Sequence, residues 1–203
     1  MNNIATIMRT GPVIPVLVIE DASYARPVAE ALVAGGLCVL EVTLRTPAAL
    51  DVIRVMRTVV GAIVGAGTVL NEADLRASID AGAAFIVSPG LTEPLGRAAI
   101  AGGVAFLPGI ANAGDIMRGL DLGLTHFKFF PAEASGGISA LKALAAPFYQ
   151  CKFCPTGGVT LATASDWLAL DPVLCVGGSW LVGKGAPDTT AIRKAAEACA
   201  KLR

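Results

Sequence analysis

Apolar residues follow two alternating patterns along the chain, one typical of buried strands and one typical of helices that pack on a sheet. Eight strand-like runs occupy residues 13–18, 37–43, 62–66, 84–88, 104–108, 125–130, 151–155 and 173–176. Each run is followed by a segment of helical period, such as the one that contains Leu50, Ile53 and Met56. A short helix at residues 3–9 is expected to precede the first strand.

Polar residues and glycines mark the expected ends of these helices. Four residues are suited to cap helix N-termini: Ser23, Asn71, Thr92 and Asn112. Three acidic residues are placed to favour the helix dipole in first turns: Asp74, Glu93 and Asp115. Four glycines stand where helices are expected to end: Gly35, Gly82, Gly102 and Gly123.

Near-continuous apolar strands that alternate with helices predict a parallel sheet, and eight such units are the number that closes a barrel. The predicted fold is therefore an α/β fold, a (β/α)8 TIM barrel with a short N-terminal helix, in a single domain over residues 1–203. An open doubly wound sheet is the alternative. It is less favoured because the glycine-rich stretch at Gly65–Leu70 lacks the last glycine of a dinucleotide-binding motif. The stretch Gly178–Lys184 likewise resembles a P-loop, but Gly185 replaces the Ser or Thr that such a loop requires.

Composition narrows the classes of partner. Basic and acidic residues balance at 16 each, so the chain has no basic field to attract nucleic acid or anionic lipid. Small molecules are the expected partners. The N-terminal residues lack the features of a secretory signal, and no apolar stretch is long enough to cross a membrane, so we expect a cytoplasmic protein.

The single histidine, His126, argues against a zinc cluster or a histidine-based triad, and no metal or cofactor is expected. Five cysteines stand mostly in apolar surroundings and are interpreted as reduced, packed thiols. Cys151 and Cys154 form a C-x-x-C pair, but residues three apart in a strand point to opposite faces. Acid–base chemistry therefore has to come from carboxylates or lysine.

A lysine among phenylalanines is the strongest chemical signal. Lys128 lies in the sequence THFKFFPAE, and it shares one strand face with His126 and Phe130. Burial disfavours the charged form of an amine, and a neutral lysine is a nucleophile that forms Schiff bases with ketones. The alternative is a lysine whose stem packs and whose head reaches water. Lys152 is a second candidate, but it lies early in its strand, toward the bottom of the barrel.

The second strand carries the other half of this chemistry. Glu41, Thr43 and Arg45 share one face of it, and apolar residues occupy the other face. The polar face is expected to line the barrel axis, close to the C-terminal rim where barrels of this type keep their active sites. An ion pair of Glu41 with Lys128 or Arg45 that only fills the barrel is the alternative, and it is less favoured because perturbed groups gather at functional sites.

Small polar residues and glycines end the other strands. Thr68 follows the third strand, and Pro89 follows the fourth, where they could contact a substrate. The loops after the seventh and eighth strands contain Thr156-Gly157-Gly158 and Gly177-Gly178-Ser179. Paired glycines allow backbone N–H groups to approach an anion, and these two loops are the usual phosphate site of the fold. Phosphate binding through N–H groups, Ser179 and the positive end of a following helix is therefore expected.

Several of these stretches together resemble one family. They are LEVTLRT from Leu40, GAGTVL from Gly65, SPGLTEP from Ser88, FKFFPAE from Phe127, FCPTGG from Phe153 and GGSWL from Gly177. The chain is similar over about residues 11–182 to the KHG/KDPG aldolase family, class I aldolases that act on 2-keto-3-deoxy-6-phosphogluconate (KDPG) in the Entner–Doudoroff pathway. It departs from that family after Val182 and at Glu20-Asp21, where some relatives carry lysines.

The resemblance implies a role for each matching residue. Lys128 would form the Schiff base, Glu41 would be the general acid and base, and Arg45 would bind the substrate carboxylate. Thr68 and Pro89 would form part of the pyruvyl pocket, and Phe130 would also bind the substrate. The rest of the substrate and its phosphate would be held by Thr156, Gly157, Gly158, Gly178 and Ser179. The implied enzyme is a cofactor-free homotrimer that cleaves KDPG to pyruvate and glyceraldehyde 3-phosphate.

Other functions remain open. A phosphosugar isomerase or synthase on the same barrel would use Glu41 as its base and form no covalent adduct. A barrel that only binds a phosphosugar would turn nothing over. Within the aldolase interpretation, the sequence does not separate KDPG from its C4 epimer or from 2-keto-4-hydroxyglutarate (KHG), whose cleavage would give pyruvate and glyoxylate.

Overall fold

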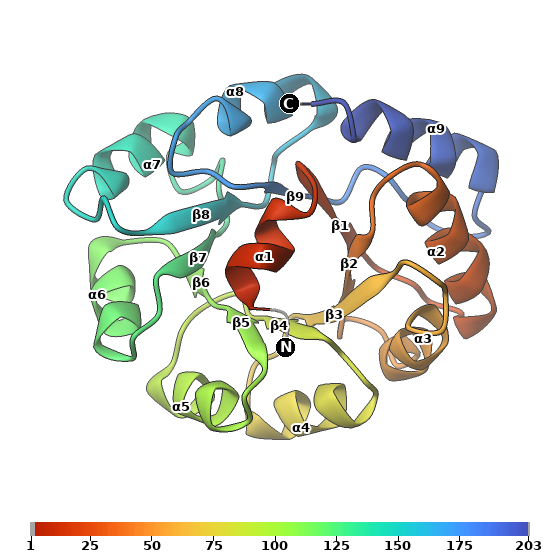
Figure 1. Cartoon of the computed structure of the whole chain (residues 1–203), viewed down its shortest axis with the longest axis horizontal. Helices are drawn as coiled ribbons and strands as arrows, with labels where there is room; N and C mark the ends of the chain where they lie inside the picture. The colour runs from red at the N-terminus through yellow and green to blue at the C-terminus, as the bar shows by residue number, and fades with distance from the viewer. Residues whose placement is uncertain (1–2, 203) are drawn as a thin grey trace.

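The computed structural model describes residues 3–202, and its strands form a parallel ring surrounded by helices (Figure 1). The strands are β1 (Val13–Leu17), β2 (Val39–Thr43), β3 (Ile63–Gly67), β4 (Phe85–Val87), β5 (Ala105–Leu107), β6 (Gly109–Ile110), β7 (His126–Phe129), β8 (Lys152–Pro155) and β9 (Val176–Gly178). The helices are α1 (Ile4–Arg9), α2 (Ala25–Ala34), α3 (Ala49–Met56), α4 (Glu72–Asp80), α5 (Glu93–Ala101), α6 (Ala113–Asp121), α7 (Gly137–Ala145), α8 (Leu161–Leu168) and α9 (Thr189–Cys199).

The strand order closes the ring. One sheet has the order β5-β4-β3-β2-β1-β9, and a second has the order β6-β7-β8. The sheets meet at Pro108, which separates β5 from β6 and has no N–H to continue the ladder. On the other side, single bridges from Phe153 to Val173 and from Thr156 to Gly177 join β8 to the β9 segment. Counting β5 and β6 as one interrupted strand gives the predicted barrel of eight.

The eighth strand differs from its prediction. It was expected at residues 173–176, but the strand that pairs with β1 is Val176–Gly178, with Val13 opposite Val176 and Pro15 opposite Gly178. The apolar run before it makes only the single bridge of Val173, so an apolar pattern alone placed the strand too early. Gly177 and Gly178 were expected in the loop after the strand, whereas they are its last two residues.

Most helix boundaries follow the prediction. Asn71, Thr92 and Asn112 each accept a hydrogen bond from a backbone N–H of the first turn, and the expected acidic residues lie in those turns. Ser23 was wrong as a cap. It lies inside the 3-10 turn Ala22–Tyr24, and Asp21 accepts the N–H of Ser23 at 2.8 Å. Asp21 therefore caps the 3-10 turn in place of Ser23, and α2 begins after Tyr24 without a side-chain cap.

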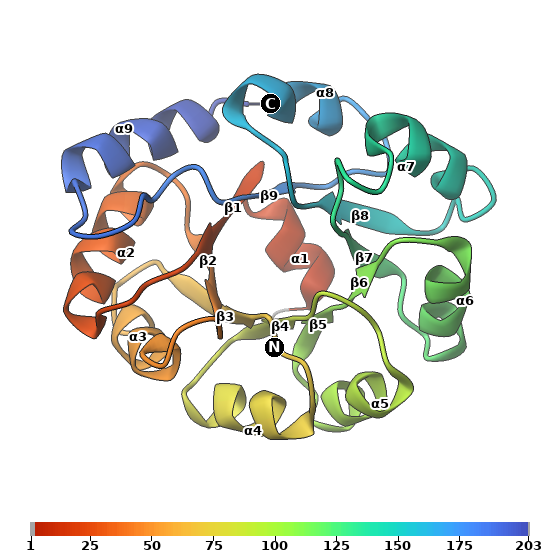
Figure 2. The ribbon, with the colours of Figure 1, turned by 180° about the vertical axis from the view of Figure 1, so that it is seen from behind.

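Helix α1 closes one end of the barrel. Figure 1 shows it across the middle of the ring, and Figure 2 shows the opposite end, where the strands open to the loops. Ile7 and Met8 of α1 are fully buried against residues that point into the barrel, including Ile14, Val39 and Phe85. Burial of each such side chain contributes about 1.5–3 kcal/mol. The interior below the strand C-termini is therefore a packed apolar core.

A larger apolar layer lies between the strands and the helices, and it contains Leu40 and Val42 of β2. The predicted faces of this strand are confirmed, because Val39 and Glu41 point into the barrel while Leu40 and Val42 pack under the helices. Within residues 3–202, no helix is both long and apolar enough to cross a membrane. The single-domain assignment stays a prediction.

Candidate active site

A cavity of about 290 Å³, here called the inner cavity, opens among the C-terminal ends of the strands. Ten of the eleven predicted site residues line it: Glu41, Arg45, Thr68, Pro89, Lys128, Phe130, Thr156, Gly157, Gly158 and Ser179. Gly178 does not line it, whereas its neighbours Gly177 and Ser179 do. The fold therefore brings together predicted site residues that lie up to more than 130 positions apart in the sequence, with the exception of Gly178.

The inner cavity is centred on a buried ion pair. Lys128 Nζ donates a hydrogen bond to Glu41 Oε1 at 3.1 Å, and the two side chains are only 7% and 4% exposed. The ammonium also lies 5.3 Å from the centre of the Phe130 ring, within the range of a cation–π contact. The interpretation of Lys128 as a strand-end lysine with its head in water is wrong, since the head is enclosed.

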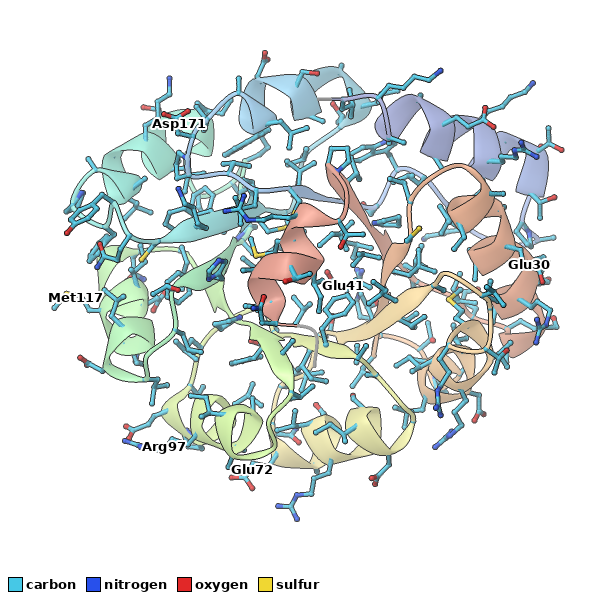
Figure 3. The ribbon with its side chains drawn as sticks, viewed as in Figure 1. Glu30, Glu41, Glu72, Arg97, Met117 and Asp171 are labelled. Carbon is cyan, nitrogen blue, oxygen red and sulfur yellow. The ribbon has the colours of Figure 1, made fainter. Side chains whose placement is uncertain are left out.

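Glu41 reaches the barrel axis because β3 leaves room for it. A Cβ atom at Gly67 would overlap the Glu41 carboxylate, so a glycine is required beside it. Figure 3 shows Glu41 near the middle of the ring, while Glu30, Glu72 and Asp171 lie at its edge. Among the six buried polar or charged residues of the described chain, Glu41 is the one carboxylate. A buried carboxylate beside a buried amine is a site for proton transfer.

A hydrogen-bonded chain orients Arg45 at the rim. Thr43 Oγ1 donates to the carbonyl of Leu17 at 2.8 Å and accepts a hydrogen bond from Arg45 Nε at 3.1 Å. Only Nε is used in this way, which leaves the two terminal nitrogens of the guanidinium free to bind both oxygens of a carboxylate. Thr43 was placed on the correct face by the sequence, but its role in holding Arg45 could not be predicted from spacing.

Thr68 has a backbone conformation that threonine rarely adopts. Its φ is 59°, the one positive φ of a residue other than glycine in the described chain. A β-branched residue in the left-handed region is strained by about 1–3 kcal/mol, and such strain gathers at binding sites. The sequence showed only a polar residue after a strand, so this signal required the structure.

The loop after β8 has the backbone expected of an anion site. Gly157 and Gly158 have φ values of 97° and 83°, which other residues adopt only with strain. The loop is fastened to the preceding one, because the N–H groups of Ala132 and Glu133 donate to the carbonyls of Thr156 and Gly157 at 2.8 and 3.0 Å. The glycine pair is thus held in place at the edge of the inner cavity.

The loop after β9 differs from the expectation. A Cβ at Gly178 would overlap the Trp180 ring, so this glycine makes room for an aromatic side chain and does not face the cavity. The next helix, α9, begins only at Thr189, and the Asp188 carboxylate accepts the N–H groups of Thr190 and Ala191 at 3.0 Å. Two N–H groups of its first turn are therefore occupied by Asp188, and the expected contribution of this helix to phosphate binding stays a prediction.

The rival groups lie outside the inner cavity. Lys152 begins β8, pairs in register with His126, and does not line the cavity. Burial lowers the pKa of His126, and the positive charges of Arg9 and Lys152 lower it further. Cys151 and Cys154 are buried and free, and burial raises the pKa of the Cys151 thiol. No group of three or more His, Cys, Asp or Glu that could hold a metal occurs among residues 3–202.

A second cavity, here called the outer cavity, has a volume of about 420 Å³ and shares Val16, Arg45 and Ser179 with the inner cavity. It also contains Lys184 and Glu20. Lys184 was not among the predicted site residues, because the P-loop-like stretch Gly178–Lys184 was discounted.

The barrel and its buried amine–carboxylate pair define an α/β-barrel enzyme with a buried lysine beside a carboxylate at its C-terminal mouth. Residues 4–195 match the family described as KDPG and KHG aldolase. The chain is 58% identical to the 2-dehydro-3-deoxy-phosphogluconate aldolase of Zymomonas mobilis, over 98% of this chain and 97% of that protein. It is 57% identical to the KHG/KDPG aldolase of Escherichia coli K12, over 87% and 84% of the two chains.

A solved structure agrees with these relatives. The KDPG aldolase of Legionella pneumophila, crystallised with pyruvate as a covalent carbinolamine intermediate, superposes with a TM-score of 0.95 at 42% identity. The alignment covers 98% of this chain and 99% of that one. The protein belongs to the KDPG and KHG aldolase family, and the resemblance noted in the sequence is confirmed.

Proposed function

We propose that the protein is a class I aldolase that cleaves KDPG to pyruvate and glyceraldehyde 3-phosphate. The observation that carries this proposal is the buried contact of 3.1 Å between Lys128 Nζ and Glu41 Oε1 at the mouth of the barrel. It places a nucleophilic amine and a proton acceptor together, as imine formation requires. The names of the curated relatives and the pyruvate adduct of the Legionella protein support the same chemistry.

The geometry suggests how the covalent step begins. The carboxylate of Glu41 accepts a proton from Lys128, and the neutral amine attacks the C2 carbonyl of the substrate to form a carbinolamine. Glu41 then returns its proton to the carbinolamine hydroxyl, which leaves as water. This step gives a protonated imine, which is an electron sink beside C3, and restores the Glu41 carboxylate. Exclusion of solvent from the pair strengthens the interaction of Glu41 with the developing charge.

Cleavage uses the same carboxylate. Glu41 accepts the proton of the C4 hydroxyl while the C3–C4 bond breaks and its electrons move into the imine, leaving an enamine of pyruvate. The aldehyde product carries away C4, C5 and C6. Glu41 then gives this proton to C3 of the enamine, and one water hydrolyses the resulting imine to release pyruvate and the free Lys128 amine.

The remaining residues of the inner cavity would position the substrate. Arg45 would bind the C1 carboxylate with its two free nitrogens, and Thr68, Pro89 and Phe130 would enclose the pyruvyl part. Thr156 lines the same cavity directly before the glycine pair in the chain, and it would meet the sugar hydroxyls. The phosphate would lie near Gly157, Gly158 and Ser179. Gly178 would act only through the room it leaves for Trp180.

Borohydride trapping tests the proposal. Wild-type protein incubated with pyruvate and sodium borohydride should lose activity and gain one reduced pyruvyl adduct, which peptide mass spectrometry should locate at Lys128. An adduct at Lys152, or no adduct, would contradict it. An isomerase or a binding protein that uses Glu41 without a Schiff base would also form no adduct, so the experiment separates these alternatives.

We further propose that KHG is a second substrate, since the E. coli relative is named for both activities. KHG shares the 2-keto carboxylate and the C4 hydroxyl, which are the groups that Arg45, Lys128 and Glu41 would engage. A cleavage assay that detects pyruvate with both substrates tests this. We also retain the homotrimer, the cytoplasmic location and the single domain as proposals, and light scattering of the purified protein tests the first.

A further inference from the structure

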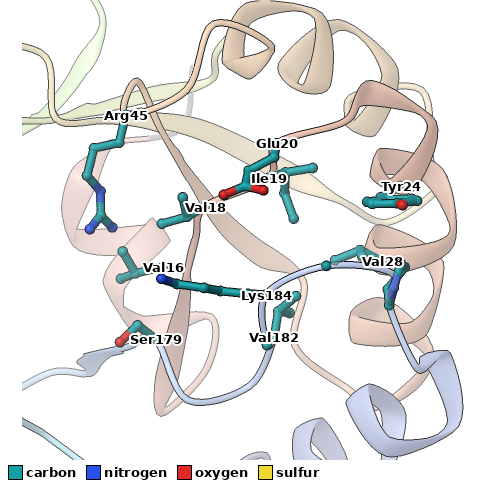
Figure 4. A pocket seen from close by; sticks show the side chains of 13 residues that line it. Val16, Val18, Ile19, Glu20, Tyr24, Val28, Arg45, Ser179, Val182 and Lys184 are labelled. Atoms are coloured by element: carbon teal, nitrogen blue, oxygen red, sulfur yellow. The ribbon is translucent and has the colours of Figure 1, made fainter.

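The outer cavity extends the inner one toward helix α2. Arg45 and Ser179 line both, so a substrate whose keto end lies at Lys128 has a continuous path past these residues. Figure 4 shows that the side chains of Arg45 and Lys184 extend their charged ends toward the same part of the outer cavity, beside Val16. The two cations come from segments 139 positions apart, after β2 and after β9.

The charges at this mouth are not balanced. Lys128 and Glu41 neutralise each other, which leaves Arg45 and Lys184 against the single carboxylate of Glu20. Within residues 3–202, neither Lys184 nor Glu20 makes a hydrogen bond or an ion pair with its side chain. Lys184 is thus an uncommitted cation that lines a cavity continuous with the reactive lysine.

A terminal phosphate needs such a cation. It carries a charge of about −1.5 to −2 near neutral pH. The glycine loops supply N–H groups but contain no basic residue, and the N-terminus of α9 is occupied by Asp188. The N-terminus of α8 is similarly satisfied by a capping box of Thr160 and Thr163. Arg45 is assigned to the carboxylate at the other end of the substrate.

We propose that Lys184 is the specificity-determining residue for the phosphorylated end of the substrate, and that Glu20 opposes it. This inference rests on the proposed function. Lys184 would contribute its charge from the outer cavity to a phosphate held near Gly158 and Ser179. Gly183 and Gly185 flank it, and all three residues line the outer cavity. An uncharged substrate end would gain nothing from Lys184.

A pair of substrates that differ only in the phosphate tests this residue. Wild type, Lys184→Met and the control Lys142→Met are assayed with KDPG and with unphosphorylated 2-keto-3-deoxygluconate. Lys142 is an exposed lysine of α7 that lines neither cavity. Lys184→Met removes the cation that would bind the phosphate, so it should lower kcat/KM for KDPG, mainly by raising KM. The expected factor is about 5- to 30-fold, because solvent partly screens a charged hydrogen bond at an exposed site.

The same variant should change kcat/KM for the unphosphorylated substrate less than about twofold, and Lys142→Met should match wild type on both substrates, as expected of an exposed charge without a partner. Equal losses of Lys184→Met on both substrates would mean that the lysine is structural or binds the carboxylate, and would overturn the inference. No loss on KDPG would overturn it as well.

Glu20 provides a second test with the opposite sign. Glu20→Gln removes a negative charge from the cavity and should lower KM for KDPG by roughly two- to threefold. The difference in KM between the variant and wild type should become smaller at high ionic strength, because salt screens the charge. A higher KM would contradict the inference. Failure of the proposed function itself has a separate signature: wild type would then form no borohydride adduct with pyruvate. If the adduct forms and the two variants show no phosphate-specific effect, only the inference about Lys184 fails.

Discussion

The two ends of the barrel are built from the same strands but differ in what their side chains do. On β2, Val39 and Glu41 point to the same interior only two residues apart, about 7 Å along the strand. Val39 packs on helix α1 with Ile7 and Met8, whereas Glu41 binds Lys128 beside an open cavity. The closed end is apolar and filled, and the open end holds charges that the protein must desolvate.

This difference separates stability from reactivity along a single strand. A buried ion pair costs desolvation energy that its attraction barely repays, so Lys128 and Glu41 are poor contributors to folding. The apolar end supplies that stability instead, through contacts that require only shape and volume. Changes at the closed end should therefore alter the free energy of unfolding, and changes at the open end should alter turnover.

The largest expected effect contrasts two lysines at opposite ends. Lys128→Met removes the proposed nucleophile and should lower KDPG cleavage by about four orders of magnitude or more. Lys152→Met, at the bottom of β8, should leave kcat/KM within about threefold, because it is remote from the substrate and partly exposed. Steady-state kinetics on the two folded variants test this prediction. Comparable losses of kcat/KM in both variants would contradict the different roles of the two lysines.

The next effect separates two steps at the open end. Glu41→Gln keeps the size of the side chain and removes its proton acceptor, so cleavage should fall by roughly 10²–10⁴-fold. Trapping of pyruvate by borohydride should survive, although more slowly, because the amine of Lys128 is still present. Loss of both in a protein with wild-type circular dichroism would indicate that the pair is structural.

The closed end should respond in stability alone. Met8→Ala empties a fully buried position and should lower the free energy of unfolding by about 2–5 kcal/mol, with kcat/KM unchanged at temperatures where the variant is folded. Met117→Ala is the matched control, since that methionine of α6 is 57% exposed. Urea denaturation measures both, and a smaller loss for Met8 than for Met117 would refute the assigned packing.

The smallest effect is a pH dependence at the closed end. Burial, Arg9 and Lys152 lower the pKa of His126 below its unfolded value near 6.5. The folded state therefore favours neutral His126, and the stability this provides is present above pH 6.5 and is lost as the pH falls through the lower folded pKa. The free energy of unfolding should decline less on acidification in His126→Gln than in wild type, and an identical decline would exclude His126 as a contributor.

Periodicity predicted the fold well because the relevant forces are local. Alternation along β2 placed Glu41, Thr43 and Arg45 on the interior face before any contact was known. The barrel followed from the repeated strand–helix pattern, and Lys128 from the conflict between its charge and its apolar neighbours. Each of these signals is contained in a few consecutive residues.

Signals that depend on distant contacts could not be predicted. Gly177 and Gly178 pair with β1, and they have to be glycines because Thr156 and Trp180 occupy the space that side chains there would need. The positive φ of Thr68 and the cavity that Lys184 shares with Arg45 likewise became visible only in the folded chain. Sequence spacing was enough to select Lys128 and Glu41, which the structure brings into contact, but the borders of the cavity required three dimensions.

Helix α1 also makes the active site a blind passage. Because the helix seals the far end, substrate and both products must use the same opening above Lys128. The pyruvyl fragment is tethered at the innermost position, and the aldehyde lies between it and the solvent. Product release is therefore ordered by position alone: glyceraldehyde 3-phosphate must depart before pyruvate can leave, and pyruvate should be the product that competes directly with substrate for the free enzyme.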